Sequence, residues 1–331
     1  MTATMTNTRR GVLKALALTL PVLGAPPLAI AQDPWPSKPL RIVVPFAPGG
    51  AGDVVTRLVA ARLSLRLNQP VVVDNKPGAG GSIGPGTVAR SAPDGYTLAF
   101  VSSGYAWLAA TYPGLSFDPA KDLQPVALIC SVPYAVITRP DAPFKTFPEF
   151  VAYAKANPGR VSFASAGAGT LTHLLPAWVA SEAGINLIHV PFGGTAPAMN
   201  SLVSGQTDIY FDPLSTSKVQ LQAGRVRVLA TTGTTRPASF NDAPTLPELG
   251  YAAQGSTWFG IMAPKGVPRL IVDRLNREIN AVLQEDEVKA KLHGMDFSID
   301  ATTVEKFGGF LNQQMATWAK VIKENGIKSS N

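Results

Sequence analysis

The sequence predicts an α/β protein built on parallel-rich sheets. Short apolar runs recur along most of the chain, separated by amphipathic segments or glycine-rich turns. Most runs have neighbouring apolar residues rather than a regular alternation of apolar and polar ones, as in strands that helices cover on both faces. Glycine-rich loops join several of these runs to the helical segments that follow them, which is the order of strand–loop–helix units.

Nine runs before residue 250 predict buried strands. They are LRIVV (40–44), PVVV (70–73), TLAFV (97–101), VALIC (126–130), AVIT (135–138), RVSFA (160–164), NLIHV (186–190), TDIYF (207–211) and RVLAT (227–231). They form two series, from residue 40 to about 130 and from about 135 to 230. The two series predict two similar lobes.

The chain changes character after residue 250. STWFGIMAP (256–264) predicts one more strand, and residues 268–284 predict a helix with Leu270, Val272, Leu275, Ile279 and Leu283 near helical spacing. Residues 303–326 predict a second helix that ends at Gly326. These helices need a surface to cover. We expect them to pack back on the first lobe, so that the chain crosses between the lobes twice.

The first 31 residues have the pattern of a cleavable export signal. Arg9, Arg10 and Lys14 precede an apolar stretch, and Ala29-Ile30-Ala31 offers a small-residue cleavage site before Gln32. The apolar stretch contains three prolines, which disfavours a membrane-spanning helix. The arginine pair resembles a twin-arginine signal, and a Sec signal remains the alternative. Both predict a mature chain in the periplasm.

Composition excludes several classes of function. Loss of the leader's three cations lowers the formal net charge from +7 to +4, a mild excess without basic blocks that does not predict nucleic-acid binding. Cys130 is the only cysteine, so no intrachain disulfide can form. The three histidines are far apart in sequence and there is no HExxH or CxxC motif, so we expect no metal site and no cofactor.

Four glycine-rich loops lie between a predicted strand and a predicted helix. They are FAPGGAGD (46–53), NKPGAGGSIG (75–84), SAGAGTLTH (165–173) and PFGGTAP (191–197). Glycine lets a ligand approach the backbone closely, and a helix N-terminus presents unpaired N–H groups with a partial positive charge. Such loops can bind an anion without a cationic side chain. The alternative is structural, with Asp53, Thr170 and Thr195 as ordinary helix N-caps.

A carboxylate fits these loops better than a phosphate. GAGGSIG departs from GxGxxG at Ile83, and no loop carries GK[ST]. A carboxylate needs only two or three main-chain donors with hydroxyl groups beside them. The candidate hydroxyls belong to Ser82, Ser102, Ser103, Ser165, Thr170 and Thr195.

A hydrolase is the alternative from another class of function. Ser165, His173 and Asp212 supply the residue types of a catalytic triad, and FASAG resembles the nucleophile motif G-x-S-x-G. Phe163 replaces the first glycine of that motif, and the chain order differs from Ser…Asp…His, so the sequence disfavours a triad. Asp212 can equally be a turn residue or a ligand contact.

Long segments resemble one known family. RIVVPFAPGGAGDVVTRLVAARLS, VVVDNKPGAGGSIGPGTVARSAPDGYTL, SAGAGTLTHL, HVPFGGTAPAMNSLVSGQTDIYFD, GRVRVLATTGTTRPASFNDAPTLPELGY, WFGIMAPKGVP and WAKVIKENGIK follow its pattern in order. The sequence is therefore similar to the Bug-type, TctC-like receptors, the periplasmic solute-binding proteins of tripartite tricarboxylate transporters. Pro176 departs from the pattern, which usually has a helix former there, and leaves the helix start and the direction of His173 open.

The resemblance implies a two-lobed type II periplasmic binding fold. Each lobe is expected to be a mixed, mostly parallel sheet flanked by helices, with the ligand cleft between the lobes. With the order of the strands, this gives a signal at 1–31, a first lobe of 32–131 plus 250–331, and a second lobe of 132–249. The resemblance also implies that main-chain and hydroxyl groups hold a carboxylate, with bridging waters. The expected ligand-binding residues are Phe46, Ala47, Pro48, Gly49, Gly50, Gly80, Gly81, Ser82, Ser102, Ser103, Ala166, Gly167, Thr170, His173, Phe192, Gly194, Thr195 and Asp212.

We therefore expect a monomeric, non-enzymatic receptor that closes its lobes on a small organic acid. The acid can be a mono-, di- or tricarboxylate, or an acidic amino acid or its amide. The receptor is expected to deliver it to the membrane permease of a tripartite tricarboxylate-type transporter, or to present it to a sensor. The remaining alternatives are a periplasmic hydrolase using Ser165 and an interaction protein that uses the lobes as a scaffold.

Overall fold

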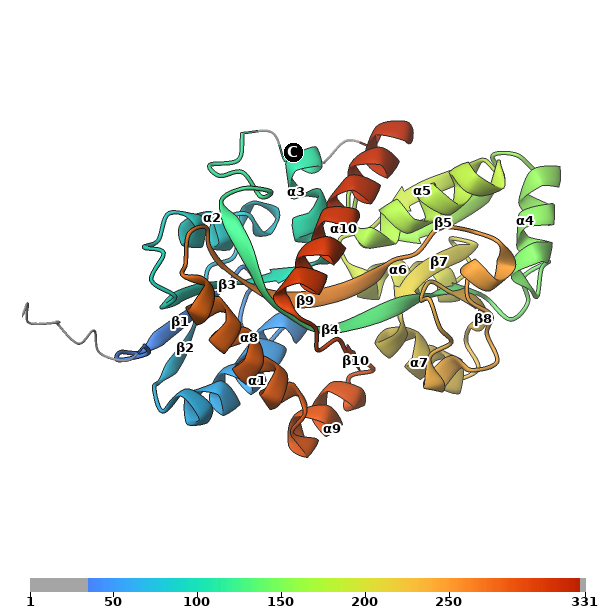
Figure 1. The fold of residues 1–331 in the computed structure, drawn as a ribbon. Helices are drawn as coiled ribbons and strands as arrows, with labels where there is room; N and C mark the ends of the chain where they lie inside the picture. The colour runs from blue at the N-terminus through green and yellow to red at the C-terminus, as the bar shows by residue number, and fades with distance from the viewer. Residues whose placement is uncertain (1–34, 113, 328–331) are drawn as a thin grey trace, which may run out of the picture. The chain divides into compact units, whose positions relative to one another are not determined.

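The computed structural model describes residues 35–112 and 114–327, so the predicted export signal lies outside the described residues. Figure 1 shows strands flanked by helices. The strands are β1 (Leu40–Val44), β2 (Val71–Asn75), β3 (Thr97–Ser102), β4 (Leu123–Thr138), β5 (Val161–Ser165), β6 (Leu187–Pro191), β7 (Ile209–Pro213), β8 (Arg227–Thr231), β9 (Ser256–Pro264) and β10 (Ser298–Ile299). The α-helices are α1 (Ala51–Leu67), α2 (Ile83–Ala89), α3 (Leu108–Thr111), α4 (Phe147–Ala156), α5 (Leu171–Ala183), α6 (Thr195–Val203), α7 (Leu214–Gln222), α8 (Arg269–Leu283), α9 (Asp286–Gly294) and α10 (Val304–Glu324).

The strands form one mixed sheet, in the order β2-β1-β3-β9-β4-β7-β5-β6, with β8 and β10 also paired to β4. Strand β1 pairs in parallel with β2 and β3, and β5 pairs in parallel with β6 and β7. Between these two groups, β9 and β4 run antiparallel to their neighbours. The predicted α/β class is confirmed, and the parallel pairs lie in the two series of apolar runs.

Strand β4 corrects one prediction. The sequence predicts separate strands at 126–130 and 135–138, because Ser131 and Pro133 interrupt the apolar run, whereas the structure joins both into one strand of 16 residues. Residues 123–133 pair with β9, and residues 134–138 pair with β7 and β8. Pro133 is the last residue of the β9 ladder. Its missing N–H therefore falls where β4 changes partners and interrupts neither ladder.

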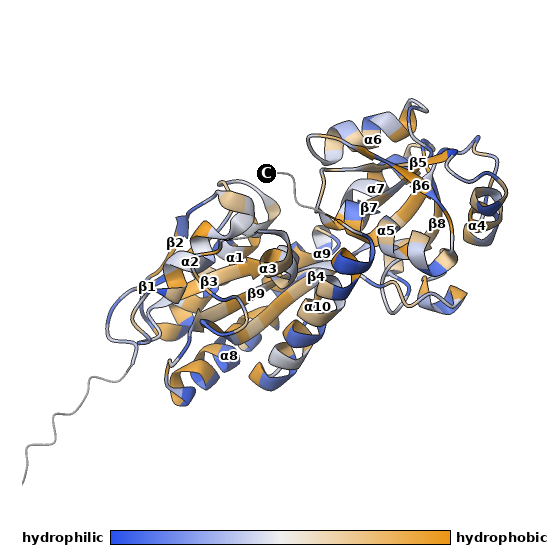
Figure 2. Cartoon of the chain, turned by 90° about the horizontal axis from the view of Figure 1, so that it is seen from above, coloured by the Kyte–Doolittle hydropathy of each residue, from blue (hydrophilic) through white to orange (hydrophobic). Residues whose placement is uncertain are grey.

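The core lies on both faces of the sheet. In β1, Val43 belongs to one buried cluster, while Ile42 and Val44 belong to a second cluster, because successive strand residues point to opposite faces. Figure 2 shows the strands in the colours of apolar residues, with hydrophilic residues on the helices around them. The predicted C-terminal helices cover opposite faces, since α8 contributes to the second cluster and α10 to the first. Leu270, which the sequence places on the apolar stripe of α8, is exposed.

Two of the predicted helix N-caps are wrong. Thr170 occupies the N-cap position of α5, as predicted, but its side chain makes no capping hydrogen bond. The N-cap position of α1 is Gly50 and not Asp53, and that of α6 is Gly194 and not Thr195. Gly50 has the extended geometry of an N-cap, whereas Gly194 has a φ of +137°. Neither has a side chain that could cover the first N–H groups of its helix. Pro176 lies inside α5 and therefore gives up one N–H bond of that helix. Helix α9 (Asp286–Gly294) was not predicted from the sequence.

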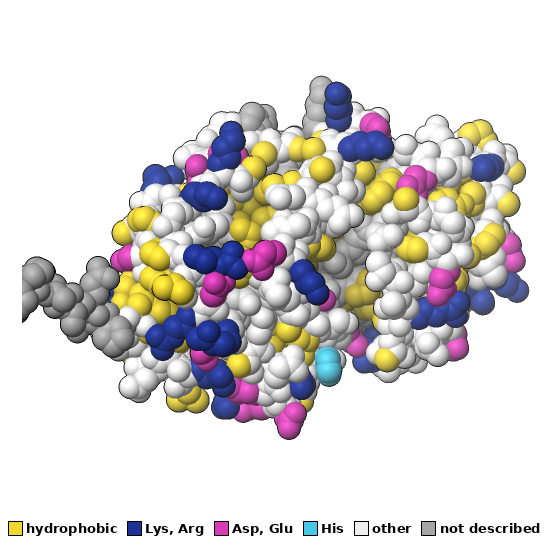
Figure 3. All heavy atoms as spheres, in the orientation of Figure 1, with side chains coloured by type: hydrophobic (Ala, Val, Ile, Leu, Met, Phe, Trp, Pro, Cys, Tyr) yellow, Lys and Arg dark blue, Asp and Glu magenta, His cyan; other side chains and the backbone are white. Residues whose placement is uncertain are grey.

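The predicted division into lobes stays a prediction. Its first boundary, between residues 131 and 132, falls inside β4 where that strand approaches its change of partners. The second, between residues 249 and 250, precedes β9. Among the helices of residues 35–112 and 114–327, none has both the length and the hydropathy that a membrane span needs. Figure 3 shows Lys and Arg side chains beside Asp and Glu on one face of the molecule.

Candidate functional site

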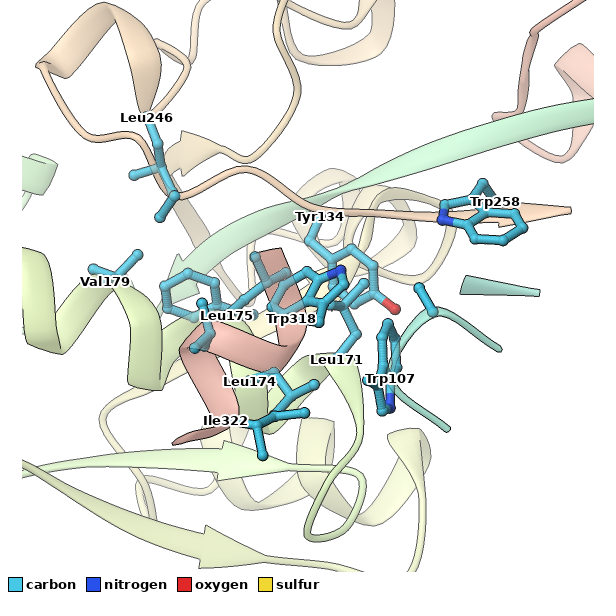
Figure 4. Close-up of a cluster of buried hydrophobic side chains, with 14 of the residues drawn as sticks. Trp107, Tyr134, Leu171, Leu174, Leu175, Val179, Leu246, Trp258, Trp318 and Ile322 are labelled. Carbon is cyan, nitrogen blue, oxygen red and sulfur yellow. The ribbon is translucent and has the colours of Figure 1, made fainter. Parts of the chain in front are cut away.

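A cavity of about 630 Å³ lies among the loops that follow β1 and β3, the start of α5, and strands β4 and β9. This volume is within the usual range for small-molecule sites. The lining residues are Phe46, Ala47, Pro48, Gly50, Ala51, Gly52, Gly80, Ser102, Ser103, Gly104, Trp107, Leu108, Thr111, Tyr112, Tyr134, Ala168, Gly169, Thr170, Leu171, Thr257 and Phe259. Figure 4 shows Trp107, Tyr134 and Leu171 gathered from three different elements.

The cavity brings together part of the predicted set. Eight predicted residues line it: Phe46, Ala47, Pro48, Gly50, Gly80, Ser102, Ser103 and Thr170. Gly81 lines a small adjoining cavity of about 20 Å³. The other predicted residues do not line the main cavity: Gly49, Ser82, Ala166, Gly167, His173, Phe192, Gly194, Thr195 and Asp212. Seven of the eight, all except Thr170, precede β4 in the chain. They come from the three loops that follow β1, β2 and β3, which meet at one edge of the sheet.

Sequence reasoning missed most of the aromatic wall. Trp107 and Tyr112 follow β3, where the rule that ligands sit beyond strand ends could have found them. Tyr134, Thr257 and Phe259 come from β4 and β9. Those two strands meet by antiparallel pairing between distant segments, and no local sequence pattern signals that contact.

The N-terminus of α1 opens on the cavity. Ala51 and Gly52 line it, and the first N–H groups of a helix have no partner within the helix. The N-cap, Gly50, has no side chain that could cover them. These amides, with the positive end of the helix dipole, form an anion-binding position.

Asp53 fixes the loop in front of this position. Its carboxylate accepts hydrogen bonds from the Gly49 amide (2.9 Å), from Arg57 (3.0 and 3.1 Å) and from Asn75 (2.8 Å). Asn75 also donates to the Phe46 carbonyl (3.0 Å). Hydrogen bonding to Arg57, above all, lowers the pKa of Asp53 to about 2. Asp53 is therefore an ionised support of the loop, and its charge is balanced by Arg57.

Gly80 lies in the glycine-rich loop that follows β2 (residues 75–84), where this loop packs against Tyr112 of the cavity wall. Its φ is +62°, and a Cβ atom there would lie 2.1 Å from Cζ of Tyr112. Only glycine combines this conformation with this approach without displacing the tyrosine ring. The glycine pattern of the loop thus fixes one side of the cavity.

The hydrogen-bonding groups of the loop that precedes α5 are paired largely with one another and with the first turn of the helix. Ala166 N–H donates to Thr172 Oγ1 (2.8 Å), Gly167 N–H to Ser165 Oγ (3.2 Å), and Gly169 N–H to His173 Nδ1 (3.1 Å). Thr170 Oγ1 donates to the Gly167 carbonyl (2.7 Å) instead of capping the helix. This loop therefore offers a ligand fewer free donors than the loop before α1.

His173 and His189 form a stacked pair. Their ring centroids lie 3.8 Å apart with an interplanar angle of 8°, and Phe163 stacks on His189 at 4.9 Å. Burial, together with the neighbouring His189, lowers the pKa of His173 to about 4. A neutral His173 is required for its hydrogen bond, because a protonated ring could not accept from Gly169.

The structure does not assemble the hypothetical triad. Ser165 Oγ lies 2.6 Å from Nε2 of His189, not beside His173. Asp212 accepts hydrogen bonds from the hydroxyls of Thr216 (2.6 Å) and Ser217 (2.7 Å). Burial raises the pKa of Asp212 to about 6. Neither histidine is oriented by this carboxylate, so the arrangement lacks the third member of a Ser–His–Asp site.

Charged side chains are missing from the wall. Among the described residues that line the cavity, none is Asp, Glu, Lys, Arg or His. Over the same described part of the chain, no group of three or more His, Cys, Asp or Glu residues is placed to hold a metal ion. Binding must therefore rely on amides, hydroxyls and apolar surface.

Comparisons with known proteins agree with this geometry. Residues 55–327 match the model of the tripartite tricarboxylate transporter family receptor, TctC. The chain is 35% identical over 303 residues to Protein BugT of Bordetella pertussis, covering 90% of this chain and 93% of that protein.

Two solved structures extend the comparison. A TctC solute-binding protein from Polaromonas, solved without ligand, is 30% identical with a TM-score of 0.81, covering 88% of this chain and 100% of that one. A protein from R. palustris, solved with adipate, is 31% identical with a TM-score of 0.74, covering 90% and 100%. The chain therefore belongs to the tripartite tricarboxylate transporter receptor family, and it is a solute-binding receptor rather than an enzyme.

Proposed function

We propose that this chain is an exported receptor that captures a small organic acid in the cavity and delivers it to the membrane permease of a tripartite tricarboxylate-type transporter. The observation that carries the proposal is the uncapped N-terminus of α1, which presents Ala51 and Gly52 to a cavity without charged side chains. A carboxylate is the small biological anion that two or three amides can hold and later release.

The binding residues of the proposal are those that line the cavity around α1. Ser102 and Ser103 line the same wall, and Ser102 makes no capping hydrogen bond with its side chain. Thr170 lines the cavity from the start of α5. The adipate held by the relative from R. palustris supports a carboxylate ligand for this chain as well.

Closure of two lobes about β4 and β9 completes the proposed site. Both strands continue from the part of the sheet that holds β1–β3 towards the part that holds β5–β8, as Figure 1 shows. Bending there brings the remaining predicted residues of the second series towards the ligand: Ala166, Gly167, His173, Phe192, Gly194, Thr195 and Asp212. Domain closure of this kind is a common form of ligand capture.

A thermal-shift panel tests the proposal. The mature chain, beginning at Gln32, is unfolded and refolded to remove any ligand that it carried, and is then heated with mono-, di- and tricarboxylates, acidic amino acids and the matching carboxamides. We expect at least one carboxylate to raise the melting temperature, since a ligand that binds only the folded state stabilises it. The neutral carboxamide of that acid is expected to give no shift. If no acid shifts the transition, the proposed function is wrong.

The proposed export and oligomeric state have separate tests. Cleavage by either the twin-arginine or the Sec pathway is expected to give a periplasmic protein with Gln32 at its N-terminus, which N-terminal sequencing of the periplasmic fraction checks. Light scattering of that protein is expected to give the mass of a monomer.

A further inference from the structure

Five aromatic residues contribute to the wall of the cavity. Phe46, Trp107, Tyr112, Tyr134 and Phe259 all line it. Leu108 and Leu171 add apolar surface between them. Figure 4 shows Trp107, Tyr134 and Leu171 close to one another in one buried cluster. Aromatic side chains can make stacking and edge contacts with a ring of the ligand, contacts that a short hydrophilic acid cannot use.

The wall has no partner for a second charge. No charged side chain lines the cavity among the described residues, and the adjoining loop segments 46–52, 78–82, 102–112, 166–171 and 191–195 contain no Asp, Glu, Lys, Arg or His. A second carboxylate of the ligand would lose its water there without gaining an ion pair. Burying an unpaired charge is strongly unfavourable.

The cavity also has one favoured position for an anion. The α1 N-terminus presents free amides. In the loop before α5, three amides already donate hydrogen bonds to nearby side chains: Ala166 to Thr172, Gly167 to Ser165, and Gly169 to His173. Among the residues that line the cavity as it stands, a ligand with carboxylates at both ends finds the uncovered first amides of a helix at one end only.

We infer that the receptor, if its proposed function as a carboxylate receptor holds, selects monocarboxylates that carry an aromatic body. The carboxylate lies at the N-terminus of α1, and the ring lies among Trp107, Tyr112 and Phe259. This class is narrower than the small acids of the proposed function. It also differs from a diacid such as the adipate of the R. palustris relative.

Isothermal titration calorimetry of the refolded, ligand-free chain tests the inference. The probes are benzoate and phenylacetate as aromatic monocarboxylates, succinate and adipate as diacids, and glutamate as an amino acid. We expect the better aromatic acid to bind at least about tenfold more tightly than any of the other three, a difference of about 1.4 kcal/mol. Tightest binding by a diacid or by glutamate overturns this inference and leaves the proposed function standing. Binding of none of the acids overturns both.

A charge introduced into the wall gives an independent test. Tyr112 lines the cavity and is half-buried, so Tyr112→Arg supplies the missing cation to a second carboxylate. We expect it to raise the affinity for adipate and to reduce the preference for the aromatic acid about tenfold or more. The matched control is Tyr153→Arg, which places the same change on exposed α4 away from the cavity and is expected to leave the preference as in the wild type. A folded Tyr112→Arg variant with the wild-type preference would contradict the assignment of the wall.

Discussion

The carboxylate of Asp53 lies 2.9 Å from the amide nitrogen of Gly49 and accepts its hydrogen bond. Gly49 has a φ of +88°, and its loop leads directly into the uncapped first turn of α1. A side chain in the third position of the helix thus holds the backbone in front of it. The sequence suggested an N-cap at Asp53, and the structure gives this residue a supporting role behind the anion position.

Removing this support is expected to weaken both the fold and the site. Asp53→Ala deletes hydrogen bonds to Gly49, Arg57 and Asn75, and bonds to a charged group are each worth about 1.5–3 kcal/mol. We expect the free energy of unfolding to fall by about 2 kcal/mol or more in urea titrations, and carboxylate affinity to fall about tenfold.

The control for this variant is Asp273→Ala. Asp273 pairs with Arg269 on the surface of α8, where an ion pair contributes at most about 1 kcal/mol. We expect wild-type ligand affinity in this control. Equal ligand affinities in the two variants would show that Asp53 does not shape the site.

Alanine substitutions at two glycines distinguish the effect of backbone strain from the effect of a contact with the cavity wall. Gly80 and Gly184 share a φ of +62°, but only at Gly80 would a Cβ atom meet Tyr112. Each change to alanine is expected to cost about 1–2 kcal/mol of unfolding free energy from the left-handed conformation. Only Gly80→Ala is expected to change ligand affinity, because the ring of Tyr112 must move. Calorimetry that finds the same affinity in both variants would rule out Tyr112 as part of the binding wall.

Asp212 gives the protein a predictable dependence on pH. Burial raises its pKa from 3.8 to about 6, so the folded state holds a proton that the unfolded chain releases near pH 3.8. This contribution to stability is complete below pH 3.8 and is lost as the pH rises through about 6. Asp212→Asn removes the charge, and we expect the free energy of unfolding at pH 7.5 to rise by up to about 3 kcal/mol.

The measurement is urea unfolding between pH 4 and 8. The exposed Asp286 at the start of α9 serves as control through Asp286→Asn, which is expected to keep the wild-type profile. A profile of Asp212→Asn that falls between pH 4 and 7 as steeply as the wild type would contradict the role assigned to Asp212.

The fold could be predicted from sequence wherever a segment carries its own apolar pattern. The runs at β1, β3, β5 and β9 are buried from both sides, and the stripe of α8 is visible in Val272, Leu275 and Ile279. The continuity of β4 was not visible, because Ser131 and Pro133 look like a break until both pairing partners are known.

The candidate site also has a part that the sequence predicts and a part that it does not. The loop before α1 and the glycine of the second loop were predicted, since a strand end, glycines and a helix start adjoin in the chain. Tyr134 and Thr257, whose hydroxyls lie 2.9 Å apart in the wall, are 123 residues apart in sequence. Their contact depends on the pairing of β4 with β9, a relationship that no local pattern encodes.

The central claim is that amides at the N-terminus of α1 hold the ligand's carboxylate, and one substitution removes such an amide. Ala51 is the first helical residue, and the extended Gly50 before it (φ −74°, ψ 165°) is compatible with a following proline. Ala51→Pro therefore deletes one N–H while keeping the helix, because proline is favoured at this position. The control, Asp286→Pro, makes the same change at the start of α9 behind the extended Glu285.

Titration calorimetry of both variants with the tightest-binding carboxylate is the decisive measurement. We predict that Ala51→Pro binds about tenfold or more weakly than the wild type, because a charge-assisted hydrogen bond is lost, and that Asp286→Pro binds like the wild type. Wild-type affinity in a folded Ala51→Pro variant would contradict the account.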